Sequence, residues 1–271
     1  MKGLKFSILD LGKMYIDMNL IISAFVIGTK SNPTPTAPWD WLPIDSILID
    51  HPEKGKILLD MGCHPDAMNG YWPKSVQELS PYYYEPEQTM EKQLALCGVK
   101  PEEIKTIILS HMHIDHSGYL YMFPNAEVYV QRDEFAAALS YAFEKYDQEG
   151  RTNYLRKDLQ VPIKEYHLFD GDFEVCEGVK ILHLPGHTAG TCGLMLELEN
   201  MGNVIFTRDV AYTKYNYGPP IRISGFTYNV DMCIGAIERV HQLAKENNST
   251  VILGHDKEQY MSMKKAPFFY D

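Results

Sequence analysis

The chain has 271 residues, of which 45% are hydrophobic, and its formal net charge is −11. That hydrophobic share can form a substantial core and excludes a disordered protein. The negative charge weighs against a protein whose main task is to grip nucleic acid or an anionic membrane, but it allows an anionic small substrate beside a metal ion.

The cysteines and the N-terminal segment bear on the compartment. Five cysteines are scattered without a C-x-x-C pair, which is neither a disulfide framework nor a thiolate zinc site. This pattern suits a reducing cytosol, so we expect a cytoplasmic protein. The apolar stretch at 20–28 (LIISAFVIG) is too short to span a bilayer, and it follows Asp10 and Asp17, which is wrong for a signal peptide. We expect it to form a buried strand.

Short apolar runs alternate with helical patterns along the rest of the chain. Thr89 and Gly98 have the residue types expected at the start of a helix and just past its end. In chain order the patterns predict a loop at 28–43, two strands around a turn at 46–62, a loop at 69–88, a helix at 89–98, a strand at 104–110, a helix at 132–146, a strand within 178–187, two strands at 193–209, a loop at 215–225, a helix at 231–247 and a strand within 249–256.

Two of these segments resemble each other. Residues 46–60 and 193–209 both read as strand, polar turn with glycine, strand and aspartate. Two such hairpins, each followed by helices, predict an α/β protein with two stacked β-sheets flanked by helices.

Histidine is scarce, with 10 residues in the chain, yet three occur within HMHIDH at 111–116. His111 and His113 are two residues apart, so in an extended segment leaving a strand they project to the same side and can reach one metal ion. Asp115 and His116 follow where Ser117 and the next glycine predict a turn. They can face a second ion, about 3.5–4 Å from the first in hydrolytic two-metal sites.

Two metals need more ligands than one motif supplies. His187 in LPGHTAG, Asp209 in FTRDVAY and His255 in ILGHDKE each follow an apolar strand, so they can converge on one edge of the core. Asp209 has two carboxylate oxygens and can bridge two ions. A single histidine is as often structural, but together with the HMHIDH motif these residues indicate metal ligands. Nitrogen and oxygen ligands suit zinc, manganese, iron or cobalt.

The motifs HMHIDH, PGHTAG, a solitary aspartate after a strand and GHD, in this order, resemble the metallo-β-lactamase superfamily. The resemblance is strongest to N-acyl-homoserine lactonases and related small-lactone hydrolases. It spans almost the whole chain and implies one domain over residues 1–271, an αββα sandwich with two stacked mixed β-sheets flanked by helices. It assigns His111, His113 and His187 to the first metal, Asp115, His116 and His255 to the second, and Asp209 to both.

The resemblance also implies a mechanism. Two divalent metal ions, zinc as the first expectation, would hold a bridging hydroxide that attacks the ester carbonyl of a lactone. Tyr212 lies three residues after Asp209, where the lactonase-like enzymes carry a tyrosine that reaches the substrate's carbonyl oxygen; the alternative is a packing role. Asp115 is expected to pass a proton to the leaving ring oxygen.

Other readings stay open at this level. A glyoxalase-type thioester hydrolase shares these ligands, although it would want a further C-terminal domain. True metallo-β-lactamases most often carry a cysteine where Asp209 stands. A phosphodiesterase or RNA-processing member would want a basic surface, and the flavin-coupled diiron enzymes have glutamate in place of His113. A non-catalytic metal protein would favour one closed, cysteine-rich zinc site.

The substrate is less well defined by sequence. Tyr119 follows Gly118 where the lactonases generally carry a second glycine, and AGTC after His187 lacks their second histidine. Ile114 and the aromatic residues could line an apolar pocket for an acyl chain, or the aromatics could join loops to the core or form a homodimer interface. We expect a small-molecule lactone as partner, no nucleic acid and no membrane. The aromatic residues in question are Trp39, Trp41, Trp72 and Tyr82 to Tyr84.

Overall fold

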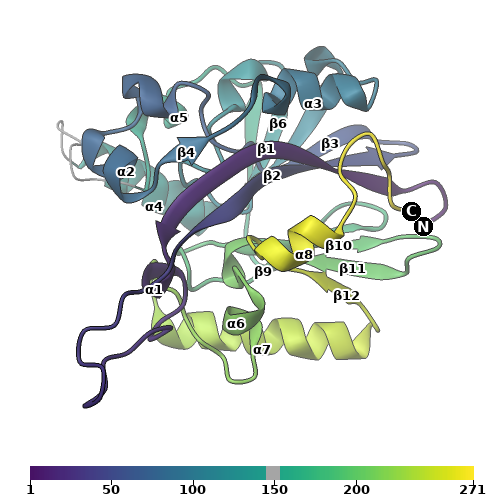
Figure 1. Ribbon diagram of the computed structural model, residues 1–271. Helices are drawn as coiled ribbons and strands as arrows, with labels where there is room; N and C mark the ends of the chain where they lie inside the picture. Colours follow the sequence, from purple (N-terminus) through teal and green to yellow (C-terminus); the bar gives the residue numbers. More distant parts are fainter. Residues whose placement is uncertain (145–152) are drawn as a thin grey trace.

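The computed structural model describes residues 1–144 and 153–271, and within them the strands form two stacked sheets (Figure 1). One sheet has the strand order β4-β1-β2-β3-β5-β6-β7 and the other has the order β12-β11-β10-β9-β8. The seven-stranded sheet contains β1 (Lys5–Asp17), β2 (Trp39–His51), β3 (Gly55–Leu59), β4 (Tyr82–Tyr83), β5 (Ile104–Ile108), β6 (Glu127–Gln131) and β7 (Glu165–Phe169). The five-stranded sheet contains β8 (Phe173–Cys176), β9 (Val179–His183), β10 (Cys192–Glu197), β11 (Asn203–Phe206) and β12 (Thr250–Ile252).

Helices cover the outer faces of both sheets (Figure 1). The seven-stranded sheet is covered by α2 (Lys74–Leu79), α3 (Met90–Leu96), α4 (Arg132–Phe143) and α5 (Arg156–Leu159), and the five-stranded sheet by α6 (Lys214–Tyr217) and α7 (Val230–Glu246). The remaining helical segments are α1 (Met18–Ile21), α8 (Lys257–Ser262), and the short turns η1 (Ala67–Tyr71), η2 (Pro86–Gln88), η3 (Pro101–Glu103), η4 (Leu120–Met122) and η5 (Arg208–Val210). The predicted αββα architecture is therefore confirmed.

Alternation along the strands explains why the layers stack. In β2, Ile47 and Ile49 pack between the two sheets, whereas Leu48 packs against the helices. In β11, Phe206 points between the sheets and Ile205 points towards α7. Strands with apolar residues on both faces must be covered on both sides, which is the reason for four layers rather than two.

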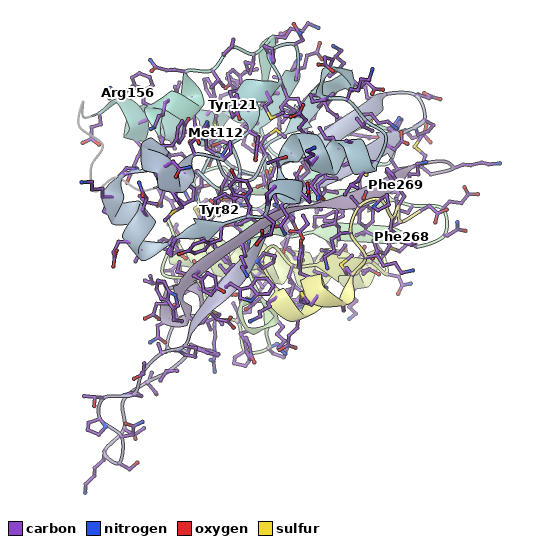
Figure 2. The ribbon with its side chains drawn as sticks, turned by 45° about the horizontal axis from the view of Figure 1, so that its top comes forward. Tyr82, Met112, Tyr121, Arg156, Phe268 and Phe269 are labelled. Atoms are coloured by element: carbon purple, nitrogen blue, oxygen red, sulfur yellow. The ribbon has the colours of Figure 1, made fainter. Side chains whose placement is uncertain are left out.

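The outer layer on the seven-stranded sheet is also filled by large side chains. Tyr82 and Met112 are 2% and 1% exposed and lie within this layer, where Figure 2 labels them. The Tyr82 hydroxyl donates a hydrogen bond to the Leu11 carbonyl oxygen, which satisfies its polar end inside the core. None of the helices in the described part of the chain has the length and apolar character needed to cross a membrane.

Strand direction gathers the loops that carry the predicted site. β3 and β5 are parallel, as are β11 and β12, and β9 runs the same way as β11 because both pair antiparallel with β10. The histidine motif follows β5, His187 follows β9, Asp209 follows β11 and His255 follows β12. Loops after parallel strands leave the same edge of a sheet, so the sandwich brings these segments together.

Several predicted boundaries were wrong. The 20–28 segment is not a strand: the Asp17 side chain accepts from Asn19 N and starts the short helix α1, after which Ala24 adopts a φ of 54°. Ile21 and Ile22 are buried but Ile27 is 65% exposed, so the apolar run does not enter the core as one unit. The predicted helix at 132–146 ends as α4 at Phe143, and residues 145 and 146 lie outside the described residues.

The predicted loops also contain regular structure. The loop at 28–43 ends early because β2 begins at Trp39, the one at 69–88 contains α2, β4 and η2, and the one at 215–225 begins within α6. Proline and glycine marked these segments as irregular, but pairing with β1 extends β2 upstream across Pro43.

Candidate metal centre

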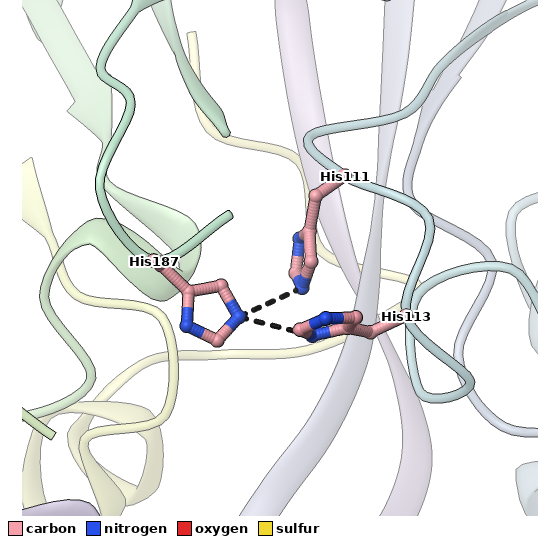
Figure 3. A group of neighbouring side chains, drawn as sticks. All are labelled: His111, His113 and His187. Atoms are coloured by element: carbon pink, nitrogen blue, oxygen red, sulfur yellow. Dashed lines mark hydrogen bonds between the residues drawn. The ribbon is translucent and has the colours of Figure 1, made fainter. Parts of the chain in front are cut away.

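Three histidines from two loops form the first group of donors. His187 Nε2 lies 3.2 Å from His111 Nε2 and 3.0 Å from His113 Nδ1, as the dashed lines in Figure 3 show. All three side chains are at most 7% exposed. We call this set the three-histidine group (His111, His113 and His187).

Four residues beside it form a second group, which we call the mixed group. Asp209 Oδ1 lies 3.0 Å from His255 Nε2 and 3.2 Å from His116 Nε2, and Asp115 Oδ2 lies 3.5 Å from the same His116 atom. One ligand atom from each member lies within 4.8 Å of the others. The mixed group consists of Asp115, His116, Asp209 and His255.

Asp209 divides its two oxygens between the groups. While Oδ1 faces the mixed group, Oδ2 lies 3.5 Å from His187 Nε2 and 3.8 Å from His111 Nε2. A carboxylate in this position can contact two ions at once, one through each oxygen.

The protonation states of the two donor groups indicate whether metal cations fit between their ligand atoms. In the three-histidine group, burial lowers the pKa of all three imidazoles, and the neighbouring histidines lower it further for His111 and His113. They are therefore neutral, and because His187 donates its Nδ1 proton to Phe226 O, its Nε2 presents a lone pair to the other two histidines. His111 Nε2 and His113 Nδ1 lie 3.2 and 3.0 Å from that atom, so three nitrogens converge on a space that a cation can occupy. The donor set thus fits a metal ion.

The mixed group calls for positive charge in a different way. Burial alone would lower the pKa of His116, but Asp209, Asp115 and Asp60 surround it and hold its pKa well above the usual value. Among the described residues, none meets hydrogen-bond geometry with the buried His116 Nε2 atom, although Asp209 Oδ1 lies 3.2 Å away. A proton on this atom balances the carboxylates, and a divalent ion would do so more fully, so this donor set also fits a metal. Together the residues can hold two divalent ions.

Hydrogen bonds to groups outside the two donor groups orient most of the imidazole rings. His187 Nδ1 donates to Phe226 O at 2.5 Å, and His255 Nδ1 donates to Pro43 O at 2.8 Å. His116 Nδ1 lies 2.8 Å from Asp60 Oδ2. With Nδ1 held outward, Nε2 is left to face the centre, as is usual for histidine ligands of metals.

One buried glutamate joins the loops of the three-histidine group. Glu134, at the start of α4, is fully buried; its Oε1 accepts from Met112 N at 2.8 Å and from the Tyr154 hydroxyl at 2.9 Å, and its Oε2 accepts from Gly190 N at 3.3 Å. Met112 lies between two histidines of the motif and Gly190 follows His187. The carboxylate thus fixes one loop relative to the other.

Two glycines permit close backbone approach at the centre. A Cβ on Gly118 would lie 2.1 Å from His64 N, and a Cβ on Gly254 would lie 2.3 Å from Arg208 O. The first contact packs the histidine motif on the loop after β3, and the second places His255 beside Asp209. Any side chain at either position would push the loops apart.

The two remaining predicted roles concern residues at the surface of the centre. The Tyr212 hydroxyl lies 3.3 Å from His187 Nδ1, and the residue is 6% exposed. The Asp115 side chain is 13% exposed. Burial would raise the pKa of Asp115, but His116 beside it lowers the pKa to about 2, so the carboxyl is ionised at neutral pH. Both residues face the pocket described next.

An apolar pocket opens directly over the donor groups. It encloses about 560 Å³, part of it open to solvent, and its lining includes His113, Asp115, His187, Asp209 and His255. This combination of an apolar wall and a few polar groups is typical of a small-molecule site. Its apolar wall is formed by Met14, Ile16, Ile21, Leu42, Val76, Leu79, Ile114 and Phe226.

Sequence reasoning placed Ile114 in such a pocket correctly, but the aromatic residues do not line it. Trp72 and Tyr82 are each 2% exposed and pack in the core, whereas Trp39 and Tyr83 are each 53% exposed. Tyr119 is also buried in the core layer rather than in the pocket. The wall comes instead from β1, α1, β2 and α2, which the motifs did not indicate.

All eight predicted site residues therefore lie together, and further polar residues support them. Asp60, Arg208 and Glu134 carried no motif of metal-ligand type. Asp60 did have one signal: it ends an apolar strand, in the same arrangement that precedes Asp209. Nothing in the local sequence marked Arg208 as buried.

Comparison with known proteins agrees with this geometry. Residues 39–255 match the model of the Metallo-beta-lactamase superfamily, and the chain belongs to this superfamily. Its relatives include the N-acyl homoserine lactonase AiiB of Agrobacterium fabrum, 32% identical over 99% of this chain and 100% of that one. The N-acyl homoserine lactonase AiiA of Bacillus thuringiensis subsp. kurstaki is 31% identical over 94% of each chain.

Solved structures show the same likeness. An N-acyl homoserine lactone hydrolase with the product N-hexanoyl-L-homoserine bound at its catalytic metal centre superposes with a TM-score of 0.82, at 28% identity over 98% of both chains. A variant of AiiA from B. thuringiensis with N-decanoyl-L-homoserine bound at its active site gives the same TM-score and identity, again over 98% of both chains.

Proposed function

We propose that this protein is a metal-dependent hydrolase that opens the lactone ring of N-acyl homoserine lactones. The observation that carries the proposal is the position of Asp209, whose two oxygens face two donor groups at the floor of an apolar pocket. Relatives that align along nearly the whole chain are lactonases of this substrate class. Of two similar solved structures, one has the product N-hexanoyl-L-homoserine at its catalytic metal centre and the other has N-decanoyl-L-homoserine at its active site.

We assign the three-histidine group to one ion, and Asp115, His116 and His255 to the other, with Asp209 shared. Zinc is the proposed metal because the donors are imidazoles and carboxylates without thiolates; manganese, iron and cobalt suit the same donors. Bound there, divalent ions supply Lewis acidity that polarises an ester carbonyl and lowers the pKa of water to about 7.

Two residues of the chain act on the reacting atoms. The Tyr212 hydroxyl, next to His187 in the pocket, donates a hydrogen bond to the carbonyl oxygen as negative charge develops there. Asp115 is ionised before the reaction, accepts a proton from the attacking water and passes it to the ring oxygen. The bond between the carbonyl carbon and the ring oxygen breaks, and the product is an N-acyl homoserine.

The apolar wall accounts for the acyl chain of the substrate. Leu79 and Val76 of α2 and Met14 of β1 lie on this wall and offer an apolar surface that an acyl chain can cover. We propose that the lactone lies on the donor groups while the acyl chain lies along this wall, with residues 1–271 forming one hydrolase domain. Cytoplasmic location and a homodimer remain predictions.

One experiment tests the activity. Metal-free protein is reconstituted with zinc, manganese or cobalt and offered N-acyl homoserine lactones, simple γ-lactones, thioesters and a β-lactam, with acid formation followed by proton release. We expect N-acyl homoserine lactones to be opened fastest and only after reconstitution. Failure to open any lactone would contradict the proposal, and faster thioester cleavage would favour the glyoxalase-type alternative.

A further inference from the structure

Arg208 has a backbone conformation that is unfavourable for its residue type. It directly precedes Asp209, is 3% exposed and has a φ of 47°. The left-handed region is costly for residues with a Cβ and is normally occupied by glycine. A long charged side chain that is buried at such a position indicates that the side chain has a role of its own.

The guanidinium joins the two sheets. Its Nε donates to Asp60 Oδ2 and its Nη1 donates to Asp45 Oδ1, both at 2.7 Å, and Nη2 donates to Asp45 O at 3.4 Å. Asp45 lies on β2 and Asp60 directly follows β3, whereas Arg208 follows β11 of the other sheet. All three residues are at most 8% exposed, so Arg208 supplies positive charge directly to two buried carboxylates.

Asp60 in turn reaches one histidine of each donor group. Its Oδ2 accepts from His116 Nδ1 at 2.8 Å and from the Ser110 hydroxyl at 2.8 Å, while its Oδ1 accepts from Ser110 N at 2.7 Å. Because the Ser110 proton is directed to Asp60, Ser110 Oγ accepts from His111 Nδ1, 3.0 Å away. One carboxylate thus sets the tautomer of His116 directly and that of His111 through a serine.

We propose that Arg208 is a positioning residue of the metal centre: it is the counterion that holds Asp60 in place, so that Nε2 of His116 and of His111 faces the ions. This inference rests on the proposed function, because it takes the donor groups as metal sites. His187 and His255 are turned by backbone carbonyl groups instead, so they do not depend on Arg208. The contact is direct only for His116, so the ion at the mixed group is the one more affected.

The test compares Arg208→Gly and Arg208→Lys with the unchanged protein. Glycine accepts the left-handed backbone and removes the guanidinium, whereas lysine keeps the charge but lacks the planar fork through which separate nitrogens reach the two aspartates. Arg239→Lys is the matched control, since Arg239 also binds a carboxylate bidentately, with Nη2 at 2.8 and 2.9 Å from Asp172, but away from both donor groups. Cobalt(II) is titrated into each metal-free protein in competition with a chromophoric chelator.

We expect Arg208→Gly to lower the affinity for one cobalt ion by about 10- to 100-fold, and the affinity for the other ion by less. Removing a residue that hydrogen-bonds to a metal ligand typically has an effect of this size. Arg208→Lys should lie in between and Arg239→Lys should match the unchanged protein. In ¹⁵N-histidine NMR spectra of the zinc-loaded protein, Arg208→Lys should alter the Nδ1–H signals of His116 and His111 but not those of His187 and His255.

The inference would be overturned if Arg208→Lys kept its affinity for both ions and its histidine signals. It would also be overturned if Arg208→Lys and Arg239→Lys lost cobalt affinity to the same extent. If Arg208→Gly does not fold, Arg208→Lys decides by the same two measurements. The unchanged protein and the Arg208 variants could all bind two cobalt ions and open lactones equally well. That result would leave the proposed function intact and remove only this inference. Absence of cobalt binding in the unchanged protein would remove both.

Discussion

The two donor groups form the floor of the pocket, and its apolar lining forms the wall. Floor and wall are built in different ways. The floor consists of histidines and aspartates that are almost fully buried and held by hydrogen bonds at distances of 2.5–3.0 Å, such as those that turn His187 and His116. The wall consists of apolar side chains that cannot form hydrogen bonds, among them Leu79, which is 37% exposed. The floor can therefore fix the reaction while the wall can vary with the substrate. The following substitutions test this division.

The largest effect is expected at the floor, from Asp209→Asn. The amide keeps the shape but loses the charge that both donor groups share, so the loss should exceed the roughly 100-fold caused by removing an outer partner of a ligand. Metal content and kcat/KM are measured on the reconstituted protein. Two bound ions with full activity would show that Asp209 is not a shared ligand.

Tyr212→Phe should give the next largest loss. Removing one hydrogen-bond donor to a developing oxyanion costs about 10²-fold in kcat, and KM should change little because the contact strengthens in the transition state. Tyr217→Phe is the control, since this tyrosine stacks on His241 outside the pocket. Equal turnover of Tyr212→Phe and the unchanged protein would return Tyr212 to a packing role.

At the wall, Leu79→Ala should change substrate preference rather than chemistry. A buried methylene contributes about 0.8 kcal/mol, about 4-fold in binding, so kcat/KM for an N-decanoyl substrate should fall by roughly 4- to 10-fold. An N-butanoyl substrate should be nearly unaffected. Leu96→Ala, on an exposed part of α3, is the control. Equal losses for long and short chains would contradict the separation of wall from floor.

The smallest effect on turnover is expected at Asp158, outside the pocket lining. Burial raises the pKa of Asp158 to about 7, although the Tyr71 hydroxyl donates to it at 2.5 Å. The folded state therefore holds this proton more tightly than the unfolded state, and its stabilising contribution, complete below about pH 4, is lost as pH rises through about 7. The difference is of the order of 4 kcal/mol.

Asp158→Asn cannot ionise and should not show this loss. Urea unfolding at about pH 5 and about pH 8 should therefore reveal a variant that gains stability relative to the unchanged protein at the higher pH, with turnover nearly unchanged. Asp170→Asn, at a position where the side chain is 72% exposed, is the control. Parallel pH profiles of Asp158→Asn and the unchanged protein would contradict the expectation.

Much of the fold could be predicted because its strands carry the signal locally. Runs such as Ile47–Ile49 and Val204–Phe206 are apolar on both faces, which already implies a layer on each side. The segment at 20–28 shows the limit of this reasoning. Its apolar composition resembles that of a strand, but Asp17 begins a helix before it, and Ile27 remains exposed.

Residue type and spacing in the sequence marked the candidate donors of the centre, because coordination chemistry restricts both. The division into a group of His111, His113 and His187 and a group around Asp209 came from the resemblance to the superfamily, and the structure brings the members of each group together. The tertiary structure alone decided the wall and the supporting network. An apolar residue can serve in a core or in a pocket, which is why Trp72 lies in the core and Leu79 in the pocket. Arg208 and Asp45 are 163 residues apart, and only the stacking of the two sheets brings their charges into contact.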